Sequence, residues 1–326
     1  MTSIVFSFPA GDSDMRNKSN DATIMKVLLI VALVAGGVGA PQATPPTPLI
    51  KENATQNLSE HVYVIPDGNI GGVPNVGIIV GSRAVLVVDT GLGPRNGETV
   101  LREVRKLSAG DIYIVGTHFH SEHILGESAF PASARVIRAR AEQKDIDEFG
   151  VQPNFATRSP AMAELVKEAS IRKADEFFDT EKLLDLGGVR VRLTWAGGGT
   201  HTDGDTLIFV EGDGVLFAGD ILMNRRFLAF GAPRSSVRSW IAAIEKAAPL
   251  NPTHIVPSHG DLGDGTLIAS NLAYLRALQS RVAELKREGK TLQEAADAIT
   301  TEFRTTYAGW TGNAGTAARI AYDEAK

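Results

Sequence analysis

Three of the seven histidines of this 326-residue sequence fall within six residues, in the stretch Gly-Thr-His-Phe-His-Ser-Glu-His that ends at His123. The preceding residues predict a strand, and the following ones a short helix with Ser121 as its N-cap. His118 and His120 project to the same side of an extended segment, and Glu122 and His123 follow after the chain turns, so these side chains can converge. Imidazole nitrogens and a carboxylate suit zinc, and less tightly iron, manganese or cobalt. A polar loop without a metal is the alternative, but adjacent imidazoles repel one another whenever they are protonated.

Composition limits the chemistry further. The sequence has no cysteine, so disulfides are excluded and any metal must be held by nitrogen and oxygen atoms. The hydrophobic fraction of 43% allows a substantial core, and 22% charged residues is typical of a globular protein. The formal net charge of -5 argues against a nucleic-acid-binding surface, so the predicted partner is a small-molecule substrate and not a nucleic acid.

The first 57 residues are predicted to precede the catalytic domain. Residues 1–24 are interpreted as a disordered leader or a misassigned start, and residues 25–43 have the layout of a signal peptide. The apolar run within residues 25–43 is shorter than the roughly 20 residues that a membrane-spanning helix needs. We therefore expect export to the periplasm without stable membrane insertion after cleavage, with an uncleaved anchor as the alternative. Residues 44–57 are a predicted proline-rich linker.

Short β-branched strands and helical segments alternate from residue 58 to residue 262, with glycine and proline at the turns. A helical insertion is predicted over residues 160–178, and residues 263–326 have the period of a C-terminal helical extension. This mixture predicts an α/β fold. The histidine cluster then lies where a strand runs into a helix, which is where α/β sheets bind ligands.

Five motifs resemble the metallo-β-lactamase superfamily, whose signature is His-x-His-x-Asp-His followed by later ligands. They occur in family order over residues 58–262: VVDTG with Asp89, THFHSEH, GGGTHTDGDT with His201, LFAGD with Asp220, and VPSHGD with His259. The resemblance implies an αβ/βα four-layer sandwich, followed here by the C-terminal helical extension. It also implies a metal site at one edge, between two sheets.

The resemblance implies two zinc ions, each held by three ligands, with one carboxylate bridging them. The first set is His118, His120 and His201, the second is Glu122, His123 and His259, and the bridging residue is Asp220. Two such cations can share a hydroxide, because bound water has its pKa lowered toward about 7. Asp89 and Asp205 are candidates to orient ligand imidazoles, with the capping of turns as the alternative.

Glu122 departs from the family pattern, which has aspartate at this position. Its extra methylene lengthens its reach by about 1.3 Å, whereas metal–ligand distances are tight to about 0.2 Å. Glu122 must therefore adopt a different rotamer, shift the second ion or bond through water. Even without binding a metal it can act as a general base or carry a proton to the leaving group, so we predict a catalytic role for Glu122.

The predicted function is that of an exported zinc hydrolase that opens a cyclic amide, with β-lactams as the first substrate class to test. Export would place the enzyme where antibiotics are encountered. A lactonase or thioester hydrolase on the same site is the alternative, and Arg225 or Arg226 could bind a substrate carboxylate. A non-hydrolytic metal-binding or di-iron protein is a further alternative, although residues 263–326 are too short for an attached flavin-binding domain.

Other catalytic templates are not met. Residues 170–173 match the Ser-x-x-Lys pattern of serine β-lactamases, but the partner motifs Ser-Asp-Asn and Lys-Thr-Gly are absent from the sequence. The sequence also lacks a Gly-x-Ser-x-Gly elbow and a nucleotide phosphate loop. His254 and His61 are given no catalytic role.

Overall fold

The computed structural model describes residues 47–151 and 159–326. The predicted leader and signal peptide, residues 1–43, and the first three residues of the predicted linker lie outside the described residues. Within the part that is described, no helix has both the length and the apolar character needed to cross a membrane.

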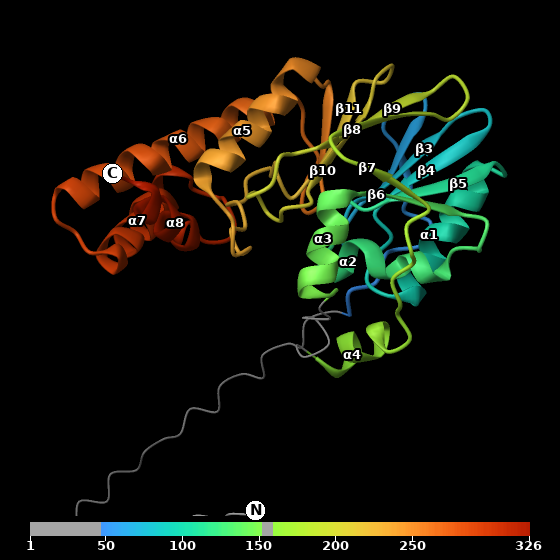
Figure 1. Ribbon diagram of the computed structural model, residues 1–326, viewed down its shortest axis with the longest axis horizontal. Coiled ribbons are helices and arrows are strands. Elements are labelled where there is room, and N and C mark those ends of the chain that lie inside the picture. The colour runs from blue at the N-terminus through green and yellow to red at the C-terminus, as the bar shows by residue number, and fades with distance from the viewer. Residues whose placement is uncertain (1–46, 152–158) are drawn as a thin grey trace, which may run out of the picture. The chain divides into compact units, whose positions relative to one another are not determined.

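The first of two β-sheets has seven strands whose spatial order follows the sequence (Figure 1). They are β1 (Gln56–Asn57), β2 (Val62–Ile65), β3 (Val76–Val80), β4 (Ala84–Val88), β5 (Asp111–Val115), β6 (Arg135–Ala139) and β7 (Glu176–Phe178). Strands β1 to β4 pair antiparallel, and β4 to β7 pair parallel. All five residues of β4 are buried, as expected for a strand that is covered on both faces.

The second sheet has five strands in the order β12-β11-β10-β9-β8. Their bounds are β8 (Glu181–Asp185), β9 (Arg190–Trp195), β10 (Thr206–Val210), β11 (Val215–Gly219) and β12 (His254–Pro257). Only the β11–β12 pair is parallel. Residues of β10 alternate between the two faces, so Ile208 and Val210 face the first sheet whereas Leu207 and Phe209 face outward.

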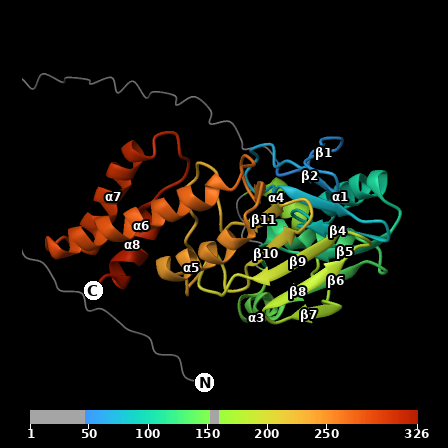
Figure 2. The same ribbon diagram turned by 90° about the horizontal axis from the view of Figure 1, so that it is seen from above.

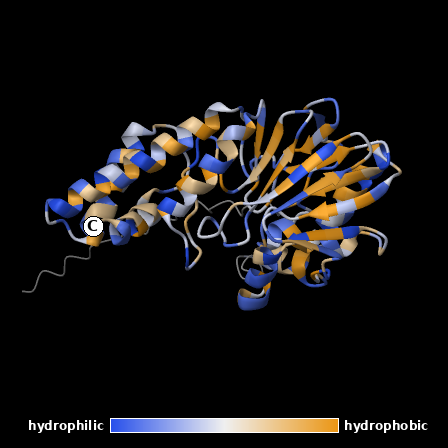
Figure 3. Cartoon of the chain, turned by 45° about the horizontal axis from the view of Figure 1, so that its top comes forward, coloured by the Kyte–Doolittle hydropathy of each residue, from blue (hydrophilic) through white to orange (hydrophobic). Residues whose placement is uncertain are grey.

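Three apolar clusters give the molecule its layers. One lies between the two sheets, and a second lies between the first sheet and α1 (Pro94–Leu107). The third joins the outward-facing residues of β10 and β11 to α5 (Val237–Ala247). It continues among α5, α6 (Thr266–Arg287), α7 (Leu292–Thr306) and α8 (Gly315–Glu324), which extend to one side of the sheets (Figure 2). Figure 3 shows the apolar strands between these helical layers. The predicted four-layer αβ/βα sandwich with C-terminal helices is confirmed.

Three short helices and two 3₁₀ segments complete the described elements. The helices are α2 (Ser121–Ile124), α3 (Arg140–Phe149) and α4 (Pro160–Val166), and the 3₁₀ segments are Leu125–Ala129 and Ala248–Leu250. The helical insertion predicted over residues 160–178 is wrong beyond Val166, because residues 176–178 pair with β6 as strand β7. Ser121 is the first residue of α2, and the N-cap is His120.

Candidate metal centre

The side chains predicted to bind metal lie at the ends of strands from both sheets. His118 follows β5 by three residues, and Glu122 and His123 lie on α2. His201 lies in the loop between β9 and β10, Asp220 directly follows β11, and His259 lies two residues after β12. The carboxyl ends of β5, β9, β11 and β12 therefore converge, and this edge of an α/β sheet is the usual ligand site.

The first group of ligand atoms consists of three imidazole nitrogens. His120 Nδ1 lies 3.0 Å from His118 Nε2 and 3.1 Å from His201 Nε2. A ring nitrogen has either one N–H or one lone pair. His120 Nδ1 can therefore make a hydrogen bond with His118 Nε2 or with His201 Nε2, but not with both at once. A cation between the three nitrogens would remove the remaining repulsion between lone pairs.

The second group consists of one carboxylate and two imidazoles. Candidate ligand atoms of Glu122, His123 and His259 all lie within 4.8 Å of one another. The rings of His118 and His123 are 4.0 Å apart between centroids, so the two groups are adjacent. The carboxylate of Glu122 therefore lies beside His123 and His259, where the family motif has the carboxylate of an aspartate.

Asp220 lies beside the first group. Its Oδ2 is 3.3 Å from His201 Nε2, and its buried Oδ1 has no hydrogen-bond partner among the described residues. Burial raises the pKa of this carboxyl, but the surrounding imidazoles, His201 foremost, outweigh burial and lower it to about 2. Asp220 is therefore a carboxylate with one oxygen free to bind a cation.

Three histidines are oriented by hydrogen bonds from their Nδ1 atoms, which leave Nε2 directed at the site. His123 Nδ1 lies 2.8 Å from Asp89 Oδ2, His201 Nδ1 lies 2.8 Å from the Ala229 carbonyl, and His259 Nδ1 lies 2.9 Å from the Val73 carbonyl. A carbonyl can only accept, so it fixes the Nδ1–H tautomer. The Nε2 atom of His123 is buried and has no hydrogen-bond partner in the described part of the chain.

Burial and mutual proximity keep His118 and His120 neutral. Desolvation, together with repulsion from the neighbouring imidazoles, lowers the pKa of His118 well below its ordinary value and the pKa of His120 to about 3. His123 behaves differently: burial disfavours its charged form, but the charge and hydrogen bond of Asp89 outweigh burial and raise its pKa to about 9. Neutral imidazoles are the form that binds metals, so His118 and His120 are ready to bind an ion, whereas His123 releases a proton from Nε2 when it binds one.

These side chains fit a divalent metal ion. They provide imidazole nitrogens and carboxylate oxygens only, which is the donor set of catalytic zinc sites. Two of their polar atoms, His123 Nε2 and Asp220 Oδ1, are buried without a hydrogen-bond partner among the described residues. Buried polar atoms are rarely left unpaired, so a bound ion is a physical reason for both.

Asp205 does not orient a ligand imidazole. Its carboxylate accepts hydrogen bonds from Thr200 Oγ1 and from the backbone N–H and hydroxyl of Thr202, over 2.5 to 2.9 Å. The structure therefore gives Asp205 the alternative role of capping the loop that carries His201. Asp89, in contrast, contacts His123 directly, and it does so from a left-handed backbone conformation with φ 62°.

The other residues considered in the sequence lie outside the two ligand groups. Arg225 and Arg226 are exposed, in the loop that also contains Ala229. His254 begins β12, and His61 Nδ1 lies 3.0 Å from Asp213 Oδ1.

Several positioning residues were missed in the sequence. Thr117 donates from its backbone N–H to Asp89 Oδ1 over 2.7 Å, and its hydroxyl lies 3.1 Å from His118 Nδ1. Asn75 donates from Nδ2 to the carbonyls of Pro257 and Gly260 on either side of His259. Thr117 adjoins the histidine motif, but nothing in the local sequence of Asn75 indicates a contact made 185 residues away.

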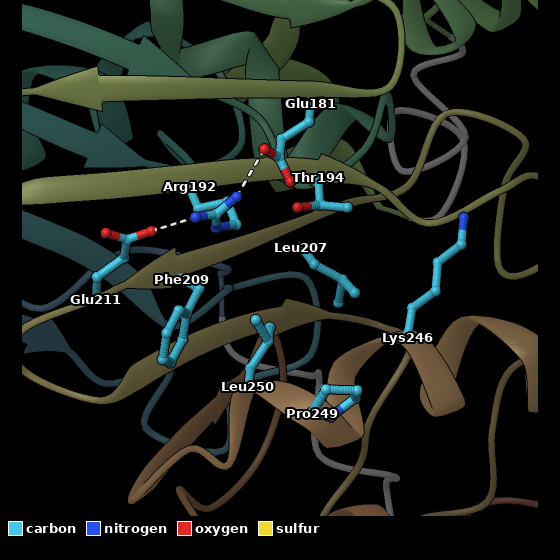
Figure 4. Close-up of a pocket in the computed structure, with 9 residues that line it drawn as sticks. All are labelled: Glu181, Arg192, Thr194, Leu207, Phe209, Glu211, Lys246, Pro249 and Leu250. Carbon is cyan, nitrogen blue, oxygen red and sulfur yellow. Dashed lines mark hydrogen bonds and ion pairs between the residues drawn. The ribbon is translucent and has the colours of Figure 1, made fainter.

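A separate surface pocket of about 450 Å³ lies on the outer face of the second sheet (Figure 4). Leu207, Phe209 and Leu250 contribute its apolar lining. Arg192 is paired with Glu181 and Glu211 over 2.6 and 2.5 Å. None of the seven candidate ligands lines this pocket, so it is distinct from the candidate metal centre.

The fold and the site together define a metal-dependent hydrolase of the αβ/βα class. The family model of the metallo-beta-lactamase superfamily matches residues 69–259. The chain therefore belongs to the metallo-β-lactamase superfamily, and the resemblance stated from its motifs is confirmed. A search of curated protein sequences found no significant match.

Solved structures with the same fold include β-lactamases and a sulfatase. A metallo-beta-lactamase from Pontibacter korlensis is 20% identical, with a TM-score of 0.55 over 68% of this chain and 98% of that chain. The DIM-1 metallo-beta-lactamase is 17% identical, with a TM-score of 0.54 over 70% and 98%. The inverting sec-alkylsulfatase Pisa1 from Pseudomonas sp. is 16% identical, with a TM-score of 0.64 over 83% of this chain, which spans half of that protein.

Proposed function

We propose that this chain is an exported zinc-dependent hydrolase with two metal ions and that it opens cyclic amides, with β-lactams as its leading substrate class. The observation that supports metal-dependent hydrolysis most directly is the convergence of three imidazole nitrogens at 3.0 and 3.1 Å beside a second group of one carboxylate and two imidazoles. His118, His120 and His201 would hold one ion, and Glu122, His123 and His259 the other, with Asp220 between them.

A bound divalent ion supplies Lewis acidity, which brings the pKa of water toward neutrality and polarises the bond to be broken. Hydrogen bonds to Asp89 and to the carbonyls of Ala229 and Val73 orient three ligand histidines so that their Nε2 atoms face the site. Glu122 lies in the second group and is 8% exposed. Its carboxylate can accept a proton from the attacking water and deliver it to the leaving group.

Hydrolysis of a sulfate ester is the second candidate function. The structural likeness to the alkylsulfatase covers 83% of this chain, against 68% and 70% for the two β-lactamases. The matched part of the chain is longer than residues 47–265, so it must include part of the C-terminal helices. The likeness of these helices therefore supports this candidate.

Metal analysis combined with a substrate panel tests these proposals. Purified protein beginning at Pro41 would be analysed for zinc, iron and manganese per chain and assayed with a chromogenic cephalosporin, an acyl lactone, a thioester and a secondary alkyl sulfate. Two zinc ions with cephalosporin turnover would support the leading proposal. Zinc with turnover of only the sulfate, or of the lactone or thioester, would reject the β-lactam assignment, and iron without turnover would reject hydrolysis.

Export is tested separately. Cell fractionation followed by N-terminal sequencing of the mature protein should find it in the periplasm with a new N-terminus after Ala40 or Ala43. Retention of Met25 in a cytoplasmic fraction would reject export without affecting the hydrolase proposal.

A further inference from the structure

Helix α3 presents three acidic residues at a spacing of three, Glu142, Asp145 and Glu148. Residues at this spacing lie on one face of a helix. Glu142 and Asp145 are buried, at 0% and 1% exposure, although acidic side chains are rarely buried without partners. Neither belongs to the two groups of candidate ligands. Arg138 Nε lies 3.7 Å from Glu142 Oε1 and accounts for part of the burial of Glu142, but Asp145 has other partners.

Asp145 bonds to the loop that carries His201. Its Oδ2 accepts hydrogen bonds from the backbone N–H groups of Asp203, over 3.0 Å, and Gly204, over 2.8 Å. These residues follow His201 by two and three positions. Arg234 Nη2 lies 3.6 Å from Asp145 Oδ1 and compensates part of its charge. A carboxylate that accepts backbone N–H bonds makes charge-assisted hydrogen bonds, which are stronger than neutral ones.

Glu142, one turn earlier on α3, packs between the two strand-end segments that carry the first ligand group. A Cβ atom built on Gly204 would lie 2.2 Å from Glu142 Cα, and one built on Gly116 would lie 3.1 Å from Glu142 Oε1. Gly116 leads into the segment with His118, which follows the first sheet, whereas Gly204 belongs to the His201 loop of the second sheet. Helix α3 therefore contacts both segments.

The separation of these segments sets the geometry of the first ligand group, because its nitrogens come from both. Asp205 shapes the His201 loop from within, through Thr200 and Thr202, but these bonds do not connect the loop to the first sheet. One backbone hydrogen bond does so, from Thr206 N–H to the Thr117 carbonyl over 2.8 Å. The two bonds accepted by Asp145 connect the same loop to α3, which follows β6 of the first sheet.

We propose that Asp145 is a positioning residue for the metal centre: through Asp203 and Gly204 it holds His201 against His118 and His120 and so raises the metal affinity of this group. The inference rests on the proposed metal site and adds a residue that contacts neither metal nor substrate. Residues that orient metal ligands from outside the coordination shell typically change metal affinity by about 10- to 100-fold when they are replaced.

The test is the zinc affinity of the full chain, measured by competition with a chromophoric chelator in the absence of substrate. Asp145→Ala removes both hydrogen bonds and should raise the zinc dissociation constant by about 10-fold or more. Asp145→Asn keeps one acceptor oxygen and should give an intermediate value. Asp147→Ala is the matched control, because Asp147 is exposed on the same helix and accepts only from Gln143 among the described residues. It should bind zinc like the wild type.

The free energy of unfolding of each metal-free variant separates positioning from a structural role. A structural role would lower stability in Asp145→Ala and leave the affinity of the folded protein unchanged, which would overturn the inference. If Asp145→Ala does not fold, wild-type affinity in Asp145→Asn would overturn it equally. Wild-type protein that binds no zinc would overturn both the proposed function and the inference. The other results named here would overturn the inference alone.

Discussion

His123 and Asp89 form a buried hydrogen-bonded pair, with 2.8 Å between Nδ1 and Oδ2 and side-chain exposures of 0% and 1%. Asp89 follows β4, and His123 lies on α2, so the pair connects the first sheet to the helix of the histidine motif. In the neutral form of His123 it also decides which ring nitrogen is free: Nδ1 keeps the proton that it donates to Asp89, and Nε2 faces the site without a hydrogen-bond partner among the described residues.

Asp89→Asn should weaken zinc binding at the second ligand group by about 10- to 100-fold. Asparagine can keep the acceptor for the Thr117 N–H, but its amide then donates to His123 Nδ1 and places the ring proton on Nε2, where the metal would bind. Zinc titration against a competing chelator measures this. Asp213→Asn is the control, since Asp213 pairs with His61 outside the ligand groups. Equal affinity in wild type and Asp89→Asn would contradict the tautomer argument.

The same pair predicts how the stability of the metal-free protein depends on pH. The pKa of His123 is raised in the folded state from 6.5 to about 9, so the folded protein binds this proton more tightly than the unfolded chain does. The resulting stabilisation is fully present below pH 6.5 and is lost as the pH rises through about 9. Urea unfolding in the presence of a chelator, between pH 6 and 10, should show this loss in the wild type and a flatter profile in Asp89→Asn. Parallel profiles would contradict the prediction.

Glu122→Gln should lower kcat by about 100-fold or more, because it removes the proton acceptor while keeping the shape of the side chain. We also expect fewer zinc ions per chain, since a neutral amide is a weaker ligand than a carboxylate. Glu122→Asp keeps the charge and should retain both ions with altered turnover. Steady-state kinetics with metal analysis measures both effects, and Glu164→Gln on the exposed surface of α4 is the control. Full activity and full metal content in Glu122→Gln would end the assignment of a role to this residue.

The sequence was sufficient to predict the architecture, and its motifs named the residues that the structure brings close together at the candidate site. The histidine motif is local: only residues 116–120 separate β5 from α2, so His118, His120 and His123 are brought close together by one turn of the chain. The later motifs could be placed because they resemble those of the metallo-β-lactamase superfamily and occur in the same order, each at or after the end of a strand. Asp89, which directly follows β4, was found through the resemblance of its motif to the first motif of the family.

The contacts that depend on distant parts of the chain were not predictable from local patterns. The Ala229 and Val73 carbonyls orient His201 and His259, and any residue type could supply a carbonyl there. Asp145 lies 58 residues before Asp203 on a helix that carries no motif. The helix predicted beyond Val166 failed for a related reason, because pairing with β6 overrode the helical period of residues 176–178.

Tyr274 gives a prediction about the C-terminal helices. It is 0% exposed, and its hydroxyl has no hydrogen-bond partner among the described residues. Its ring lies 5.5 Å from that of Phe227 and 6.0 Å from that of Phe303. Leaving a buried hydroxyl unpaired costs about 1–3 kcal/mol. Tyr274→Phe should therefore leave the free energy of unfolding unchanged or raise it by about 1 kcal/mol, with no effect on zinc affinity.

Tyr322→Phe on α8 is the matched control, because the Tyr322 hydroxyl donates to the Lys290 carbonyl over 2.7 Å. Losing this hydrogen bond should lower the free energy of unfolding by about 0.5–1 kcal/mol. Urea unfolding of both variants, with the wild type in the same buffer, gives the two changes directly. Their opposite signs would show that the aromatic cluster around Tyr274 stabilises the protein by packing alone. A loss of more than about 1 kcal/mol in Tyr274→Phe would mean instead that a water molecule bonds this hydroxyl.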